Sequence, residues 1–130
     1  MVAIDTNIVV RLLVDDDPAQ TIKVKALFTT EKIFIPKTVV LETEWVLRGV
    51  YTLDRTAINN ALRALLSLEQ VIAEDETILF DALDSYQQGM DFADALHLAS
   101  SRRATSFATF DAKFKSRAQK LSLKPIVITL

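Results

Sequence analysis

Short segments that are apolar throughout alternate along this sequence with longer segments of helical periodicity, and no other feature constrains its fold as strongly. Strands are expected in five places: 2–4, 33–35, 70–73, 106–110 and 126–128. Helices are expected in seven: 7–13, 18–28, 38–50, 55–68, 77–88, 92–103 and 112–120. Fully apolar strands separated by helices are typical of a parallel sheet with helices on both faces. The sequence therefore predicts an α/β fold.

The length of 130 residues, of which 50% are apolar, favours one hydrophobic core over two. We therefore expect a single domain that spans residues 1–130. There is no cysteine, which excludes disulfides, thiolate zinc sites and thiol nucleophiles. No run without a charged residue is longer than seven residues, and an acidic residue stands at position 5. These features argue against a membrane span and a signal peptide, so we expect a cytoplasmic protein.

Two acidic residues stand directly after expected strands, Asp5 after the first and Asp111 after the fourth. The chain has only two glycines, so a glycine-rich phosphate loop is excluded as the binding site. Ligands of open α/β sheets gather at the carboxyl ends of the strands, which is where these carboxylates are expected. Capping of the following helix would also account for either residue. Both interpretations remain open for both residues.

Glu42 lies in the expected helix 38–50 among neighbours without a basic side chain. Its neighbours at helical spacing are Thr38, Val39, Trp45 and Val46. We therefore expect Glu42 on the apolar face of this helix, where an unpaired carboxylate is unfavourable unless a metal ion compensates it. Glu44 has Arg48 four residues further on, so a solvated salt bridge is expected there. This contrast makes Glu42 the functional candidate.

Several residues at the start of expected helices are candidate N-caps: Asp17, Thr38, Asp54 and Asp91. Asp94 follows Asp91 by three residues, so the two carboxylates share a helix face. One capping acid suffices for a helix, which leaves Asp94 as a candidate for function. Gly89 is expected to end the preceding helix. His97 is the only histidine, and we expect it to support the packing or the site rather than to bind a metal ion.

Four carboxylates remain as candidates for one site at the end of the sheet: Asp5, Glu42, Asp94 and Asp111. Carboxylate oxygens without cysteine or histidine ligands select Mg²⁺ or Mn²⁺ over Zn²⁺. Such a site suits the attack of a metal-activated water on a phosphodiester. The stretch 102–124 contains seven basic residues and one acidic residue, so we expect it to contact the polyanion that the carboxylates would repel.

Four segments occur in the order and spacing of PIN-domain proteins: Ala3–Asn7, Val40–Leu47, Asp91–Leu96 and Thr109–Asp111. Over residues 2 to about 127 the chain resembles, more narrowly, the VapC toxins of prokaryotic type II toxin–antitoxin modules. The resemblance implies a three-layer α/β/α sandwich around a mostly parallel sheet. It also implies an endoribonuclease that depends on Mg²⁺ or Mn²⁺.

The four acidic residues of the family's site correspond to the four candidate carboxylates named above. The resemblance implies that Asp5 and Asp94 anchor the metal ion, directly or through water. It implies that Glu42 and Asp111 complete the shell of the ion, directly or through water, and orient the attacking water. Supporting groups fall on three polar residues: Thr6, Asn7 and Thr109. Asp91 matches the pattern but is not one of the usual ligands, in agreement with a capping role.

Partners follow from the resemblance as well. VapC-like proteins generally form homodimers, and a cognate antitoxin covers a groove near the active site. The mean hydropathy of +0.23 is high for a small domain and agrees with apolar surface left for a partner or a second copy. RNA is the expected substrate, and a membrane is not an expected partner.

Three other functions share some of these sequence features with a toxin nuclease. A housekeeping PIN-like nuclease in RNA processing would have the same chemistry without the biology of a toxin. A non-catalytic acidic module that binds metal or protein would leave Glu42 unexplained. A phosphoacceptor receiver domain needs adjacent acids near the first strand and a lysine after the fifth, and here Asp5 stands alone and the last strand is followed by Thr129 and Leu130.

Overall fold

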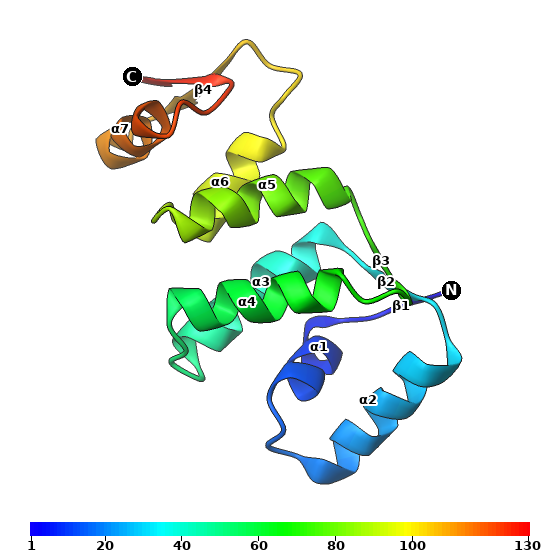
Figure 1. Cartoon of the computed structure of the whole chain (residues 1–130). Coiled ribbons are helices and arrows are strands. Elements are labelled where there is room, and N and C mark those ends of the chain that lie inside the picture. Colours follow the sequence, from blue (N-terminus) through cyan, green and yellow to red (C-terminus); the bar gives the residue numbers. More distant parts are fainter. The chain divides into compact units, whose positions relative to one another are not determined.

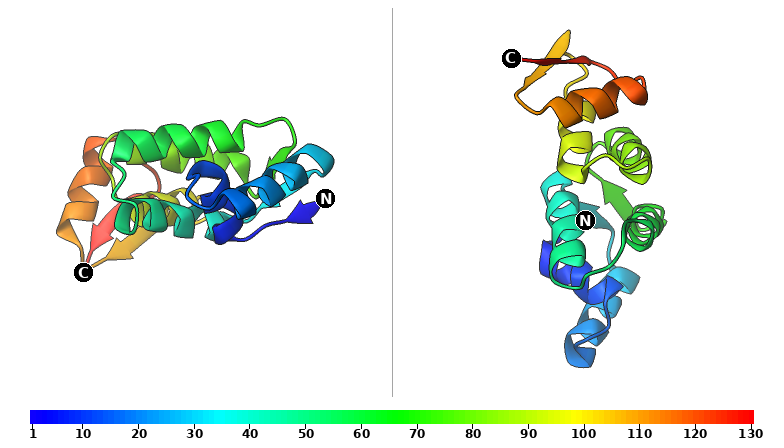
Figure 2. Two further views of the ribbon diagram at one scale, coloured as in Figure 1. Left: turned by 90° about the horizontal axis from the view of Figure 1, so that it is seen from below. Right: turned by 90° about the vertical axis from the view of Figure 1, so that its left-hand side faces the viewer.

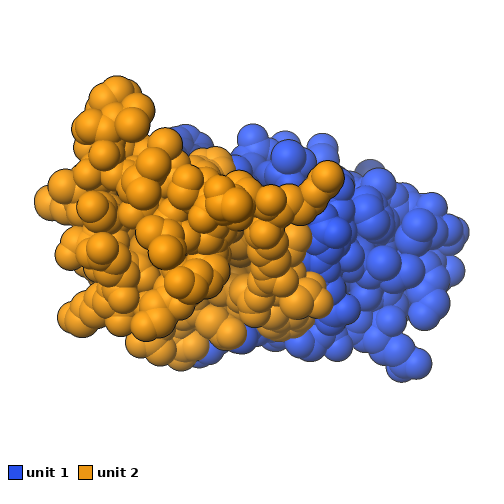
Figure 3. All heavy atoms as spheres, turned by 90° about the horizontal axis from the view of Figure 1, so that it is seen from above, with its two compact units in different colours: residues 1–76 blue, residues 77–130 orange.

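Every pair of neighbouring strands in the protein is parallel. The structure is a computed structural model that describes all residues from 1 to 130. The chain divides into two units, Met1–Glu76 and Thr77–Leu130, which Figure 3 colours separately. The first unit holds a three-stranded sheet in the order β1-β2-β3, and the second holds the pair β4-β5. The expected α/β class, with parallel strands and intervening helices, is confirmed.

The first unit alternates strands and helices along the chain (Figure 1). Its elements are β1 (Val2–Ala3), α1 (Thr6–Leu13), α2 (Pro18–Thr30), β2 (Ile33–Ile35), α3 (Lys37–Gly49), α4 (Arg55–Leu66) and β3 (Val71–Ala73). Ile33 at the centre of the register pairs with Val2 on one side and Val71 on the other. Parallel neighbours need a crossover connection, which α1 and α2 supply for the first pair and α3 and α4 for the second.

Local signals fix where the helices of this unit begin. Asp17 and Asp54 accept backbone N–H bonds from Gln20 and Ala57 at 3.2 and 2.8 Å, so both expected caps are confirmed. Pro18 occupies the first turn of α2, where its missing N–H has no cost. The apolar residues between the helices and the sheet form the core, and the following are fully buried: Ile33, Ile35, Leu47, Ile58 and Leu62.

Helix α3 turns a different face toward the interior from the one expected. Thr38 is not its cap: the helix begins at Lys37, after Pro36, and no side chain caps it. Its buried residues are Val40, Thr43, Glu44 and Leu47. Glu42 is exposed and Trp45 is 59% exposed, so the expectation that Glu42 lies on the apolar face is wrong. The apolar Trp45 indicates the wrong face in the sequence, because the helix buries Val40 and Leu47 and leaves Trp45 exposed.

The buried carboxylate of α3 is Glu44. Its side chain is 3% exposed and accepts from Arg48 Nε at 2.9 Å and Nη2 at 3.4 Å. The expected pair is therefore present, but it is not solvated on the Glu44 side. Pairing with Arg48 offsets part of the cost of burying this charge.

The second unit contains α5 (Glu76–Gln87), α6 (Phe92–Ala99), β4 (Ser106–Thr109), α7 (Ala112–Lys120) and β5 (Ile126–Thr129). Strands β4 and β5 pair from Ser106↔Ile126 to Thr109↔Thr129, and α7 forms the crossover and packs beside them (Figure 2). The rings of Tyr86 and Phe92 meet edge to face with centroids 5.4 Å apart. This contact joins the end of α5 to the start of α6.

Gly89 ends α5 as expected, with a φ of +106° that L side chains rarely adopt. Helix α6 ends at Ala99, four residues before the expected position. Ser100 is its C-cap, and the Ser101 hydroxyl donates to the carbonyl oxygen of His97 at 2.7 Å, so the serines take the chain out of the helix. None of the seven helices combines the length and the apolar composition that crossing a bilayer requires.

Candidate functional site

Asp5 stands at the carboxyl end of β1 and caps α1. Its Oδ1 accepts the backbone N–H of Ile8 at 3.2 Å, and the side chain is exposed. Its second carboxylate oxygen forms no hydrogen bond within the protein. Capping therefore does not compete with ligand binding at Asp5, because each function uses a different oxygen.

The next residue, Thr6, connects this strand end to α3. Its side chain is buried, and its hydroxyl donates to Oε1 of Glu42, which lies 36 positions along the chain. This bond holds Glu42 beside the first turn of α1, at the residue that directly follows Asp5. The structure brings together three of the residues predicted for the site: Asp5, Thr6 and Glu42. Asn7 is exposed on the same turn.

A second acidic group belongs to the second unit. Asp91 caps α6 and accepts the backbone N–H of Asp94 at 3.1 Å, so its expected capping role is confirmed. Partial burial raises the pKa of Asp94, and the negative charges of Asp91 and Asp111 raise it further. His97 opposes the shift, and no lysine or arginine contributes to it. Asp94 therefore lies among like charges without a fixed counter-ion other than the histidine.

Asp111 follows β4 and caps α7. Its Oδ1 accepts from the backbone N–H groups of Lys113 and Phe114 at 2.9 and 3.2 Å, while its second oxygen forms no hydrogen bond within the protein. The backbone N–H of Asp111 donates to the Thr109 hydroxyl at 3.0 Å. Thr109 thus fixes the backbone turn from which the carboxylate projects.

The donor chemistry of these residues fits a hard divalent cation. All four carboxylates offer oxygen only, and Asp5 and Asp111 each keep one oxygen free of internal bonds. Oxygen donors of this kind suit Mg²⁺ or Mn²⁺. Neither unit by itself groups three His, Cys, Asp or Glu side chains closely enough to hold a metal ion. The first unit offers Asp5 with Glu42, and the second offers Asp94 with Asp111.

A groove between α1 and α2 opens beside Asp5, and the sequence did not predict it. It encloses about 280 Å³ and is lined by Asp5, Asn7, Ile8, Arg11, Gln20, Lys23 and Val24. Helical spacing places Arg11 on the same face as Asn7, and Lys23 on the same face as Gln20, but it does not show that these two faces meet. The groove places cationic side chains next to a predicted catalytic carboxylate.

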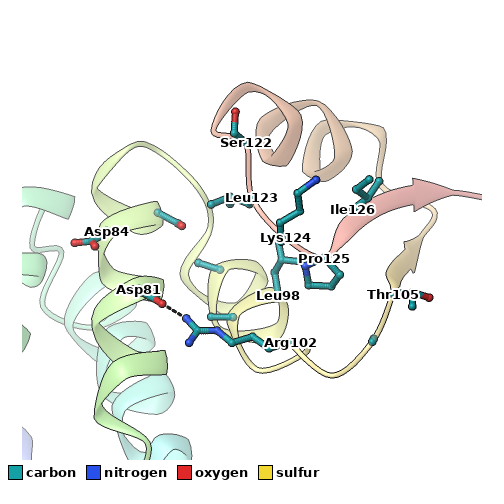
Figure 4. Close-up of a pocket in the computed structure, with 14 residues that line it drawn as sticks. Asp81, Asp84, Leu98, Arg102, Thr105, Ser122, Leu123, Lys124, Pro125 and Ile126 are labelled. Atoms are coloured by element: carbon teal, nitrogen blue, oxygen red, sulfur yellow. Dashed lines mark ion pairs between the residues drawn. The ribbon is translucent and has the colours of Figure 1, made fainter.

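The second unit has a larger pocket of about 660 Å³, bounded by α5, α6 and the start of β5 (Figure 4). Arg102 reaches across it to an ion pair with Asp81. Asp84 and Lys124 also line it, so its walls carry both signs of charge. Asp94 is not among its lining residues. This pocket therefore does not single out a polyanion, and Arg102 is already paired within the protein.

Comparison with known proteins gives one positive result. A model of the PIN domain family matches residues 2–120, across both units and all four motifs. Searches of curated proteins and of solved structures found no match. PIN domains are generally metal-dependent nucleases and act on nucleic acid. Since the match covers nearly the whole chain, this protein belongs to the PIN domain family.

Proposed function

We propose that this protein is a metal-dependent endoribonuclease and the toxin component of a type II toxin–antitoxin module, similar to the VapC toxins. The observation that carries the proposal is the hydrogen bond from Thr6 to Glu42. An exposed glutamate on a helix surface needs no donor from another helix for its solvation. Its attachment beside Asp5 supports a shared catalytic site rather than a role in stability alone.

The proposed catalytic carboxylates are Asp5, Glu42, Asp94 and Asp111. We assign Asp5 and Asp94 to anchor the metal ion, with Glu42 and Asp111 in its shell, directly or through water. The uncompensated charge around Asp94 supports this assignment, because a cation would relieve the repulsion from Asp91 and Asp111. That both acidic pairs serve one ion is part of the proposal, and the order of the four motifs within the PIN match supports it.

When bound, Mg²⁺ or Mn²⁺ supplies charge neutralisation at the phosphodiester and activation of a water for attack. The protein's own side chains orient the carboxylates for this chemistry. Thr6 restricts Glu42 by donating to one of its oxygens. The two N–H bonds to Oδ1 of Asp111 fix that carboxylate while its other oxygen stays available. Thr109 holds the turn beneath it. We assign Asn7, which is exposed on the first turn of α1, to bind water next to Asp5.

The proposal includes a cognate antitoxin and a second copy of the chain as partners. Large apolar side chains are exposed in both units, among them Trp45 at 59%, Val50 at 63% and Phe110 at 84%. Phe110 directly precedes Asp111, so apolar surface adjoins a proposed catalytic residue. Exposed apolar residues of this size support protein contacts near the site. We further propose that residues 1–130 act as one domain in the cytoplasm.

The deciding experiment measures cleavage of single-stranded RNA by the purified chain with Mg²⁺ or Mn²⁺. EDTA should abolish cleavage, and Asp94→Asn should lower its rate by at least about 100-fold, since it removes a proposed metal ligand. Glu69→Gln is the matched control, because Glu69 is exposed and forms no internal bond. Activity in EDTA, or equal rates for Asp94→Asn and Glu69→Gln, would exclude the proposed site.

A growth assay separates a toxin from a housekeeping nuclease. Induced expression of the wild type in bacterial cells should arrest growth, and expression of Asp94→Asn should not. Cleavage in vitro without growth arrest would favour the housekeeping function over the toxin.

A further inference from the structure

The groove between α1 and α2 carries an asymmetric distribution of charge. Asp5 lines it at the start of α1, and Arg11 lines it near the end of that helix. Arg11 follows Asp5 by six positions, which corresponds to about 9 Å along a helix. Lys23 lines the groove from α2. A ligand that reaches Asp5 through this groove therefore passes two cationic side chains.

Lys23 has no bonding partner within the protein. It is exposed and forms no ion pair or hydrogen bond within the protein. The groove's uncharged polar residues are Asn7 of α1 and Gln20 of α2, and its one acidic residue is Asp5 at the start of α1. Its three ammonium N–H groups are all available to a ligand.

Arg11 is held in place by three acceptors on its Nε and Nη1 side. Nε donates to Oε1 of Gln20 at 2.6 Å, and Nη1 donates to Asp16 at 3.2 Å and to the hydroxyl of Tyr51 at 3.4 Å. Tyr51 in turn donates to the other oxygen of Asp16 at 2.8 Å. A guanidinium has five N–H donors, so the two on Nη2 stay free. The Arg11 side chain is 25% exposed and is one of the residues that line the groove.

We propose that the α1–α2 groove binds a backbone phosphate of the RNA strand, with Lys23 and the free Nη2 of Arg11 as its ligands. This inference rests on the proposed function, and it assigns to these two residues the substrate contact that the sequence had suggested for residues 102–124. Guanidinium groups fixed in one orientation suit phosphate oxygens, and a lysine adds a mobile point charge. The volume of about 280 Å³ is several times that of one water, about 30 Å³, so a phosphate group fits. The phosphate bound here is not the one cleaved, because it lies away from Asp5 along the groove.

The test is a titration of a fluorescein-labelled single-stranded RNA in EDTA, which leaves the RNA intact, at several salt concentrations. Lys23→Ala should weaken binding several-fold and lower the slope of log K against log salt by about 0.7, the value for one phosphate contact on a single strand. Lys25→Ala is the matched control: it removes the same charge from the same exposed helix but lies outside the groove. Arg11→Lys keeps the positive charge but removes the paired N–H donors of the guanidinium, and it should also weaken binding.

Cleavage kinetics in Mg²⁺ give a second readout. Lys23→Ala should raise KM and leave kcat nearly unchanged, because a phosphate contact away from the cleaved bond contributes equally to substrate and transition state. Equal Kd values and equal salt slopes for Lys23→Ala and Lys25→Ala would overturn the groove proposal, whether or not the wild type cleaves RNA. No RNA binding by the wild type would overturn it too. A specific loss of binding in Lys23→Ala without cleavage by the wild type would support the groove and refute the nuclease.

Discussion

The side chain of Asp91 is bonded to the backbone of Asp94 in the first turn of α6: Oδ2 of Asp91 accepts the backbone N–H of Asp94 at 3.1 Å. The cap that begins the helix thus places a negative charge next to the partly buried carboxyl of Asp94. Asp111 adds a second negative charge from the start of α7. One local arrangement therefore stabilises a helix and at the same time raises the pKa of the residue that we assign to metal binding.

This relationship predicts how stability depends on pH without metal. Burial and like charges raise the pKa of Asp94 in the folded state above its unfolded value. The folded protein then holds this proton more tightly, so the stabilisation is present at low pH and is lost as pH rises through the raised pKa. Asp94→Asn should consequently have a higher Tm than the wild type at pH 7 in EDTA, with a smaller difference near pH 4. Thermal unfolding over this pH range measures it, and a difference that does not change with pH would contradict it.

Divalent metal should reverse the order of stability. A metal ion at 100 times its Kd adds about 2.7 kcal/mol to the free energy of unfolding. The Tm of the wild type should therefore rise on addition of Mg²⁺ or Mn²⁺, and that of Asp94→Asn should rise less. Glu69→Gln should respond as the wild type does. Equal shifts in all three proteins would show that the ion binds elsewhere.

Substitutions of Thr6 test whether the orientation of Glu42 matters, without a change of charge in the site. Thr6→Val keeps the shape of the side chain and removes the hydroxyl that donates to Glu42. Loss of a group that orients a ligand typically costs 10- to 100-fold in metal affinity or activity, and we expect an RNA cleavage rate reduced by about that factor. Thr6→Ser restores the donor and should recover most of the rate. If Thr6→Ser were as slow as Thr6→Val, the methyl group and its packing would be responsible instead.

The buried pair on α3 should affect stability and spare catalysis. Arg48→Met removes a partner of Glu44, whose side chain is only 3% exposed, and this should cost about 1–3 kcal/mol in the free energy of unfolding. Replacing both residues by Met should recover part of that loss, because no buried charge then remains. Urea denaturation gives both values. A double variant less stable than Arg48→Met would mean that Glu44 has other favourable contacts that outweigh its pairing with Arg48.

The start of a helix could be predicted from the sequence where a single N-cap side chain determines it. Asp17, Asp54 and Asp91 cap the helices they were expected to cap, because an N-cap depends on the backbone within three residues. Thr38 was expected to cap α3 and does not. The orientation of α3 depends on tertiary packing instead. Trp45 is apolar and was taken as core, but it is exposed, and the helix is turned so that Glu44 is buried and Glu42 is not.

Part of the site could be predicted because it depends on local sequence signals, as the helix caps do. Strand-end acids are visible in the sequence, so Asp5 and Asp111 were found, but whether they cap a helix or bind a ligand was left open. The structure removes the conflict, since capping uses one carboxylate oxygen of each. The groove was missed because Arg11 and Lys23 belong to different helices, and the loop that joins these helices decides which of their faces meet.

Gly89 illustrates how two helices constrain each other through a single turn. A Cβ at this position would meet Nη1 of Arg117, and that same Nη1 donates to the carbonyl oxygen of Gly89 at 2.7 Å. The turn before Asp91 is therefore tied to α7, the helix that Asp111 begins. A shorter side chain at position 117 would lose this one hydrogen bond. A side chain at position 89 would have to adopt an unfavourable φ, and it would also displace the flexible end of Arg117. The positive φ at position 89 therefore favours glycine there whatever residue stands at position 117, and the link to α7 depends on the arginine alone.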